Sequence, residues 1–248
     1  FVTPSPTSTD AAERICKRFG IDQVRFTNSG TESTMYAVRV ARSATGKMGI
    51  LKVEGGYHGS YDPFVVSAKP PLNLAGDAED PTPYIEPNLV PGDTYVVPYN
   101  NIDALEAMFE KNAKKIACFI VEPVLENLAI ILPDAGYLER VRELCDQYDV
   151  VLIFDEVKTG LTAGAHGASA RLGVKPDLIT LAKSIGGGLP LAAFGGKKKY
   201  MDFVTNGKMA HFGTFNGNPL AMAGVRAIDR ICSDQVLVDA EAMNLQPL

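Results

Sequence analysis

The stretch from residue 150 to residue 190, VVLIFDEVKTG…PDLITLAKSIGGGLP, constrains the fold of this chain more than any other. Residues 150–154 are apolar without alternation, and this short run ends at Asp155. Such a run is typical of a strand buried on both faces of a parallel sheet, and open α/β sheets bind ligands at the carboxyl ends of their strands. A second apolar run, residues 178–181, leads to Lys183 and a glycine triplet. We therefore expect two neighbouring strand ends to place the Asp155 carboxylate and the Lys183 amine in one crevice.

Strand-like and helix-like segments alternate along the rest of the chain. Further strands are predicted at residues 24–27, 50–53, 116–121 and 191–194. Helices are predicted at residues 10–19, 28–43, 101–111, 136–148, 199–204 and 220–231. In the first helix, Asp10 and Glu13 resemble a capping box, and Gly20 follows as a stop signal. The alternation predicts an α/β fold with a mostly parallel central sheet flanked by helices.

A proline-rich segment, residues 63–92, interrupts this alternation. A connection of this length without regular structure is generally a functional loop or an interface segment. Disorder is the alternative, although the aromatic residues Tyr61, Phe64 and Tyr84 argue against it.

Two short motifs near the N-terminus suit the binding of a planar, phosphorylated molecule. Ser29, Gly30 and Thr31 open a predicted helix, and the free N–H groups and the dipole of a helix N-terminus favour an anion. Simple capping of this helix by Asn28 or Ser29 is the alternative. Tyr57 lies between glycines beside a predicted strand end, with His58 next to it. An aromatic ring at such a position can stack on a planar ligand or pack on the protein itself.

A buried carboxylate beside a lysine in a glycine-rich turn meets the needs of pyridoxal phosphate (PLP). Lysine holds this cofactor as a Schiff base, and a carboxylate keeps the pyridine nitrogen protonated so that the ring can act as an electron sink. Each residue alone is weak evidence, because most lysines lie on the surface and Asp155 could cap a helix or occupy a turn. The joint pattern at Asp155 and Lys183 is what predicts a PLP site.

The composition is that of an ordinary globular protein, and it argues against some classes of binding partner. Hydrophobic residues make up 46% of the 248 residues, and the formal net charge of −5 argues against nucleic acid as the main partner. The sequence has no apolar span long enough to cross a membrane, and its first residues do not have the basic and then apolar pattern of a secretion signal. The four cysteines are far apart in the sequence, as is typical of free thiols in a reducing compartment. We therefore expect a cytoplasmic protein without a membrane partner. The three histidines share no metal-ligand spacing, so no metal site is expected.

Six motifs match a known family in order, over about residues 20–230. They are NSGTE (28–32), GYHG (56–59), VEPV (121–124), FDEVKTG (154–160), PDLITLAKSIGGGLP (176–190) and GTFNGNPLAMA (213–223). With these motifs the chain resembles the class III aminotransferases, which are PLP enzymes of fold type I. Within them it is most similar to the branch of glutamate-1-semialdehyde aminomutase and the β-amino-acid (β-phenylalanine) aminotransferases.

The resemblance implies a catalytic role for two residues. Lys183 would form the Schiff base and then move a proton between the substrate carbon and PLP. Asp155 would pair with the pyridinium nitrogen. The residues implied to bind or surround the cofactor besides these two are Ser29, Gly30 and Thr31 at the phosphate, Val157 and Tyr57 on opposite faces of the ring, His58 beside Tyr57, and Glu122 and Asn127 near the cofactor and substrate. Thr214 would reach the phosphate of the neighbouring subunit, because the family builds its sites across a homodimer interface.

Two departures from the family pattern leave the function open. This chain has Leu161 and Thr162 where the family usually has a basic residue soon after DEVxTG, and family members extend beyond both Phe1 and Leu248. Residues 1–248 are therefore expected to form the large PLP-binding domain of a fold type I enzyme, without the N-terminal segment and the small C-terminal domain. The function is expected to be transfer of an amino group between an amino acid or amine and a keto or aldehyde acceptor. The alternatives are an intramolecular 2,1-aminomutase of the glutamate-1-semialdehyde type and a non-catalytic fragment that binds the cofactor or dimerises.

Overall fold

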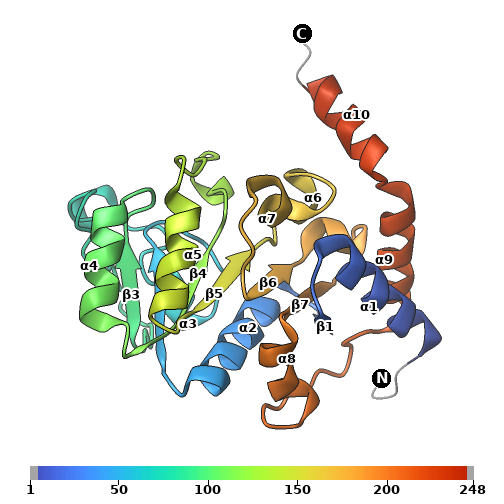
Figure 1. The fold of residues 1–248 in the computed structure, drawn as a ribbon, viewed down its shortest axis with the longest axis horizontal. Helices are drawn as coiled ribbons and strands as arrows, with labels where there is room; N and C mark the ends of the chain where they lie inside the picture. The colour runs from blue at the N-terminus through green and yellow to red at the C-terminus, as the bar shows by residue number, and fades with distance from the viewer. Residues whose placement is uncertain (1–4, 245–248) are drawn as a thin grey trace.

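A single seven-stranded sheet forms the centre of the protein (Figure 1). The computed structural model describes residues 5–244, so Phe1 and Leu248, on which the expectation of a partial chain rests, lie outside the described residues. The strands are β1 (Gln23–Thr27), β2 (Gly49–Val53), β3 (Thr94–Val97), β4 (Ile116–Val121), β5 (Val151–Asp155), β6 (Leu178–Leu181) and β7 (Ala192–Gly196). Their order across the sheet is β1-β7-β6-β5-β4-β2-β3. β7 is antiparallel to its two neighbours and the other pairs are parallel, which confirms the predicted α/β fold.

Helices cover both faces of this sheet. The α-helices are α1 (Pro6–Phe19), α2 (Gly30–Thr45), α3 (Asp62–Val65), α4 (Ile102–Asn112), α5 (Tyr137–Gln147), α6 (Thr159–Thr162), α7 (Gly167–Leu172), α8 (Lys198–Thr205), α9 (Pro219–Ile231) and α10 (Asp234–Asn244). The 3₁₀ helices are η1 (Leu72–Leu74), η2 (Glu126–Leu128) and η3 (Lys183–Gly186). α1, α4, α5 and α9 pack into one apolar cluster with one face of the sheet, and α2 and α8 pack into a second cluster with the other face.

The lack of alternation in β5 follows from its place between these two clusters. Successive side chains of a strand point to opposite faces. Leu152 and Phe154 belong to the first cluster, whereas Val151 and Ile153 belong to the second. Since both faces of β5 are buried, each of its side chains before Asp155 is apolar, as the sequence predicted.

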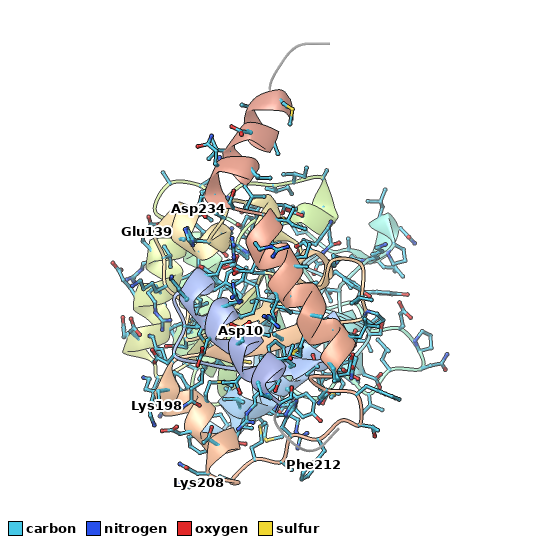
Figure 2. The ribbon with its side chains drawn as sticks, turned by 90° about the vertical axis from the view of Figure 1, so that its right-hand side faces the viewer. Asp10, Glu139, Lys198, Lys208, Phe212 and Asp234 are labelled. Atoms are coloured by element: carbon cyan, nitrogen blue, oxygen red, sulfur yellow. The ribbon has the colours of Figure 1, made fainter. Side chains whose placement is uncertain are left out.

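Two helices that are far apart in the sequence, α1 and α9, lie side by side. Figure 2 shows α1 against α9, and ion pairs join them: Arg14 with Asp229 at 3.0 Å and Arg226 with Asp10 at 2.6 Å. α10 follows α9 and projects beyond the rest of the fold (Figures 1 and 2).

The first helix begins earlier than predicted. Ser5 is its N-cap, and its hydroxyl oxygen accepts a hydrogen bond from the Ser8 N–H at 3.2 Å while the Ser8 hydroxyl accepts one from the Ser5 N–H at 2.9 Å. The capping box assigned to Asp10 and Glu13 is therefore wrong. Pro6 suits the first helical position because its fixed φ is compatible with a helix and it has no N–H to satisfy.

The proline-rich segment is irregular but internally hydrogen-bonded. The Ser67 N–H donates to the Tyr84 carbonyl oxygen and the Tyr84 N–H donates to the Ser67 hydroxyl, each at 2.8 Å. These bonds join two parts of the segment that are far apart in sequence. The edge strand β3 follows the segment, parallel to β2, and was not among the predicted strands.

Candidate active site

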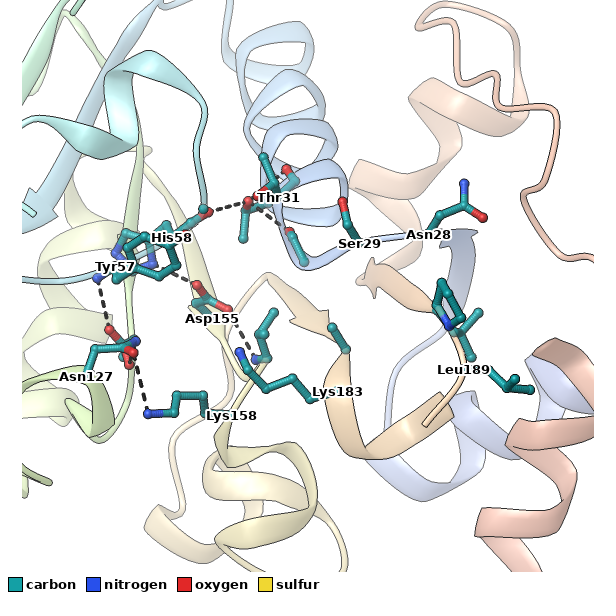
Figure 3. Close-up of a pocket in the computed structure, with 18 residues that line it drawn as sticks. Asn28, Ser29, Thr31, Tyr57, His58, Asn127, Asp155, Lys158, Lys183 and Leu189 are labelled. Carbon is teal, nitrogen blue, oxygen red and sulfur yellow. Dashed lines mark hydrogen bonds and ion pairs between the residues drawn. The ribbon is translucent and has the colours of Figure 1, made fainter. Parts of the chain in front are cut away.

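Five strand ends meet at one edge of the sheet and surround a pocket of about 350 Å³ (Figure 3). The segments that follow β1, β2, β4, β5 and β6 all contribute to its walls. The predicted site residues that line it are Ser29, Gly30, Thr31, Tyr57, His58, Glu122, Asn127, Asp155, Val157 and Lys183. Thr214 does not line the pocket. It lies exposed on the segment between α8 and α9, so its assignment to a neighbouring subunit stays a prediction.

Lys183 occupies a strained backbone conformation. It is the first residue of η3 and has a φ of +49°, directly after Ala182 in an extended conformation. A residue other than glycine in the left-handed region costs on the order of 1 kcal/mol or more, and such strain is concentrated at functional sites. The conformation aims the side chain into the pocket, where Figure 3 shows it directed toward the side that holds Asp155.

Three donors fix the Asp155 carboxylate at the end of β5. Its Oδ1 accepts hydrogen bonds from the Thr180 hydroxyl at 2.9 Å and from the Val157 N–H at 3.1 Å. Its Oδ2 lies 2.8 Å from the Nδ1 atom of His58. Both side chains of this last pair are buried, and the His58 Nε2 atom has no hydrogen-bond partner among the residues 5–244. The carboxylate is therefore a fixed negative charge at the bottom of the pocket.

The N-terminus of α2 forms another wall. Ser29 is the N-cap and its hydroxyl accepts from the Glu32 N–H at 3.2 Å, so the capping alternative is correct for this side chain. The N–H groups of the first helical turn have no intrahelical acceptor, and Gly30 and Thr31 place this turn at the pocket. A Cβ on Gly30 would lie 3.2 Å from the Val157 side chain. The glycine thus lets the helix start approach Val157 closely.

The loop that carries Tyr57 and His58 is clamped onto this helix start. The Thr34 hydroxyl donates to the His58 carbonyl oxygen at 2.7 Å, and the Thr31 hydroxyl accepts from the Ser60 N–H at 3.2 Å. Gly59 has a φ of +106°, and a Cβ there would lie only 2.8 Å from the Cα of Thr31. Only glycine combines this backbone conformation with this close approach.

Glu122 joins the loop to the far wall of the pocket. This buried carboxylate follows β4, and its Oε1 accepts from the Tyr57 N–H at 3.1 Å. Its Oε2 accepts from the Asn127 side-chain amide at 2.9 Å. The Lys158 ammonium donates to the Glu126 carbonyl oxygen at 3.1 Å and lies 3.4 Å from the Asn127 Oδ1. Glu122 and Asn127 therefore position the wall of the pocket that faces Tyr57.

Some residues that position this site were not among the predicted site residues. Thr180 could have been found by pairing the two predicted strands in register, since it lies opposite Asp155. Lys158 lines the pocket but had no predicted role. Glu156, the acid beside Asp155, is buried and accepts from the Ala168 and Ser169 N–H groups at 2.6 and 3.1 Å, so it caps α7 instead. Burial raises the pKa of Glu156.

Metal sites and membrane spans are the other features that bear on function. Within residues 5–244, no three His, Cys, Asp or Glu side chains come together in an arrangement that could hold a metal ion. None of the helices in this range is both long enough and apolar enough to cross a membrane.

The profile of one protein family, described as "Aminotransferase class-III", matches residues 2–246. The chain belongs to the class III aminotransferase family. This confirms the resemblance found in the motifs. The fold agrees with it as well, because an omega-transaminase from Sphaerobacter thermophilus superposes with a TM-score of 0.87 at 34% identity, over 95% of this chain and 55% of that structure.

The names of two further similar proteins state an activity or a bound cofactor. A glutamate-1-semialdehyde 2,1-aminomutase from Cytophaga hutchinsonii is 45% identical over 230 residues, which are 92% of this chain and 53% of that protein. A structure described as "Transaminase with PLP bound" superposes with a TM-score of 0.86 at 31% identity, over 95% of this chain and 55% of that structure. The chain thus spans about half the length of the curated relatives it matches.

Proposed function

We propose that this chain is the cofactor-binding part of a PLP-dependent enzyme that moves an amino group. One observation carries the proposal: the strained Lys183 and the fixed Asp155 carboxylate share one pocket with the N-terminus of α2. Membership in the class III aminotransferases supports it. The substrates would be a small-molecule amino donor and a keto or aldehyde acceptor.

The residues present fit PLP. A volume of about 350 Å³ is within the range of small-molecule sites. The first turn of α2, with Ser29, Gly30 and Thr31, suits the phosphate because its N–H groups and dipole favour an anion. Asp155 suits the pyridine nitrogen, since its buried negative charge favours the protonated form of a neighbouring base.

The side chains around the reacting atoms would divide the work. Bound PLP supplies an electron sink for chemistry at the carbon that carries the amino group. Lys183 Nζ is the amine to which the cofactor's aldehyde would be joined. When the amino group of a substrate takes its place there, the Lys183 amine would be free to accept and return a proton at that carbon. Val157 and Tyr57 would hold the ring between them, and His58 keeps Asp155 oriented through its 2.8 Å contact. Glu122 and Asn127 support the Tyr57 side of the pocket.

An intramolecular 2,1-aminomutase is the second candidate function. The relative named glutamate-1-semialdehyde 2,1-aminomutase supports it, while the omega-transaminase supports transfer between two molecules. An assay with glutamate-1-semialdehyde alone separates them. A mutase converts it to the isomer with the amino group moved to the neighbouring position without an added acceptor, whereas a transferase needs a second carbonyl compound for turnover.

The assembly and location stay part of the proposal. We infer a homodimer in which Thr214 of each copy reaches the phosphate site of the other, in the cytoplasm and without nucleic-acid or membrane partners. The exposed position of Thr214 outside the pocket of its own chain is compatible with that role. Residues 1–248 would be the large PLP-binding domain, with the small C-terminal domain and an N-terminal segment in the rest of the protein. A fragment that binds PLP or dimerises without turnover is the third candidate.

Covalent attachment of PLP tests the central claim. The purified chain is mixed with PLP, its visible spectrum is recorded before and after borohydride, and its peptides are mapped by mass. We expect a yellow chromophore that bleaches on reduction and leaves the cofactor's mass on Lys183. Lys183→Ala should abolish this labelling, whereas Lys175→Ala, which removes an exposed lysine, should not. A chain that stays colourless with PLP, or carries the label on another lysine, would refute the proposed site.

A further inference from the structure

Lys158 is a second lysine in the pocket, and the chemistry proposed above does not use it. It follows Val157 directly and precedes α6, and it lines the pocket together with Lys183. Its ammonium contacts two neighbouring residues of η2. It donates to the Glu126 carbonyl oxygen at 3.1 Å and lies 3.4 Å from the Asn127 Oδ1.

The loop that holds this ammonium is itself tied to Lys158. The Thr162 hydroxyl oxygen lies 2.8 Å from the Lys158 carbonyl oxygen and 3.0 Å from a Glu126 carboxylate oxygen, and its single proton can be donated to either of them. Asn127 also donates to Glu122. The ammonium is therefore positioned by η2, and the Lys158 backbone is tied to α6, so this side chain is not a free surface chain.

The two acceptors at the Lys158 ammonium, the Glu126 carbonyl oxygen and the Asn127 Oδ1, are neutral. Among the side chains that the structure describes in residues 5–240, no carboxylate lies within 4 Å of it. The two carboxylates that line the pocket already accept hydrogen bonds from other groups: Asp155 from three donors and Glu122 from two. An ammonium has three donors, so Lys158 offers the pocket one donor and a full positive charge.

Lys158 and the start of α2 lie on different sides of the pocket. Figure 3 shows Lys158 beside Asn127, on the side of the pocket away from Ser29 at the start of α2, with Asp155 and Lys183 between them in this view. A phosphate at the start of α2 would therefore leave Lys158 for a different anion. Such an anion would lie beside Lys183, where the amino group of a substrate reacts.

We propose that Lys158 binds the carboxylate of the amino-bearing substrate, so that this site selects amino acids over simple amines. This assignment rests on the proposed function, because it takes Lys183 as the reacting amine. A charge-assisted hydrogen bond to a positioned cation accounts for the selection. Losing it is expected to weaken carboxylate binding about 10- to 100-fold.

Unreactive and reactive probes test Lys158 with readouts that do not depend on turnover. Butyrate, which has a carboxylate but no amine, is titrated by calorimetry into the chain with and without PLP. Butylamine, which has an amine but no carboxylate, is titrated by its effect on the visible spectrum of the PLP-loaded chain. The variants are Lys158→Met, Lys158→Arg and, as a matched control, Lys175→Met.

We expect Lys158→Met to weaken butyrate binding at least 10-fold, to leave butylamine binding undiminished and to keep the PLP spectrum. Lys158→Arg should restore part of the butyrate affinity, and Lys175→Met should resemble the unchanged chain. Equal butyrate affinity in the Met variant, or no butyrate binding in the unchanged chain, would overturn the assignment. A changed PLP spectrum or weaker PLP loading in Lys158→Met would also overturn it, because Lys158 would then hold the cofactor. A chain that does not take up PLP contradicts the proposed function, whereas the butyrate titration without PLP still decides the role of Lys158.

Discussion

Because of Lys52, the free energy of unfolding of this protein is expected to change with pH in the alkaline range. It lies in β2, fully buried, and its ammonium donates to the Val66 carbonyl oxygen at 2.7 Å. Burial lowers the pKa of Lys52 from 10.5 to about 8, despite the opposing charges of Glu54 and Glu122. The folded protein therefore releases the Lys52 proton at a lower pH than the unfolded chain does.

The sign and size of the effect follow from this difference. Between pH 8 and 10.5 the unfolded state binds more protons at this lysine, so stability rises with pH. Below pH 8 the lysine is protonated in both states and the cost of burying the charge is felt in full. A pKa difference of about 2.5 at about 1.4 kcal/mol per pH unit gives about 3 kcal/mol.

The variant Lys52→Met isolates this contribution. The free energy of unfolding is measured by urea denaturation at several pH values from 7 to 10.5, for the unchanged chain and the variant. The lost hydrogen bond and the altered packing shift the difference by a constant, whereas the titration changes it with pH. We expect the stability of the unchanged chain to rise relative to the variant by about 3 kcal/mol across this range. A difference that stays flat with pH would refute the lowered pKa of Lys52.

Two further substitutions test the pocket. Gly59→Ala should lower the free energy of unfolding by at least about 2 kcal/mol, because the new Cβ would clash with the Thr31 backbone and the backbone would be strained. Gly92 has a φ of +57° but open space where a Cβ would lie, so Gly92→Ala should cost less. Equal losses in the two variants would contradict the need for close approach at Gly59. Asp155→Asn should keep PLP on Lys183 but slow amino-group transfer in single-turnover experiments by about 10²- to 10³-fold, since a neutral amide cannot favour the protonated ring. Asp146→Asn, at an exposed position, is the control. If Asp155→Asn transfers the amino group as fast as Asp146→Asn, the negative charge of Asp155 is not needed.

The central strands could be predicted because local pattern and tertiary environment agree there. Residues 116–121 are buried on both faces, and the sequence shows this as an uninterrupted apolar run. The edge strand β3 has only four residues, Thr94–Val97, with two of them half-buried, so its pattern does not differ from that of a loop. The start of α1 was missed because a nearby acid pair resembled a capping box while Ser5 supplied the real one.

The site could be predicted where a residue and its chemistry stand together in a motif. Lys183 and Asp155 follow apolar runs, and their common location depends only on the two strands being neighbours. The antiparallel direction of β7 could not be predicted from its sequence. Gly195 and Gly196 are required there because a Cβ would clash with neighbouring backbone atoms, and this requirement carries no information about the direction of the strand. The charge balance at Lys158 depends on where η2 lies, and no local pattern encodes that position.

The way the pocket is assembled affects how the protein reaches its native state. Its walls come from residues 28–34, 57–59, 122–127, 155–158 and 182–191, so no short segment of the chain can form the pocket by itself. Contacts between such distant segments form slowly, after the ends of long loops have been brought together. A ligand of this pocket would bind only chains in which the sheet from β1 to β2 is complete. Once the ligand is in excess, each tenfold rise in its concentration would add about 1.4 kcal/mol to the stability of these chains. Ligand supply would then act as quality control, shielding finished molecules from proteolysis while incomplete ones stay susceptible.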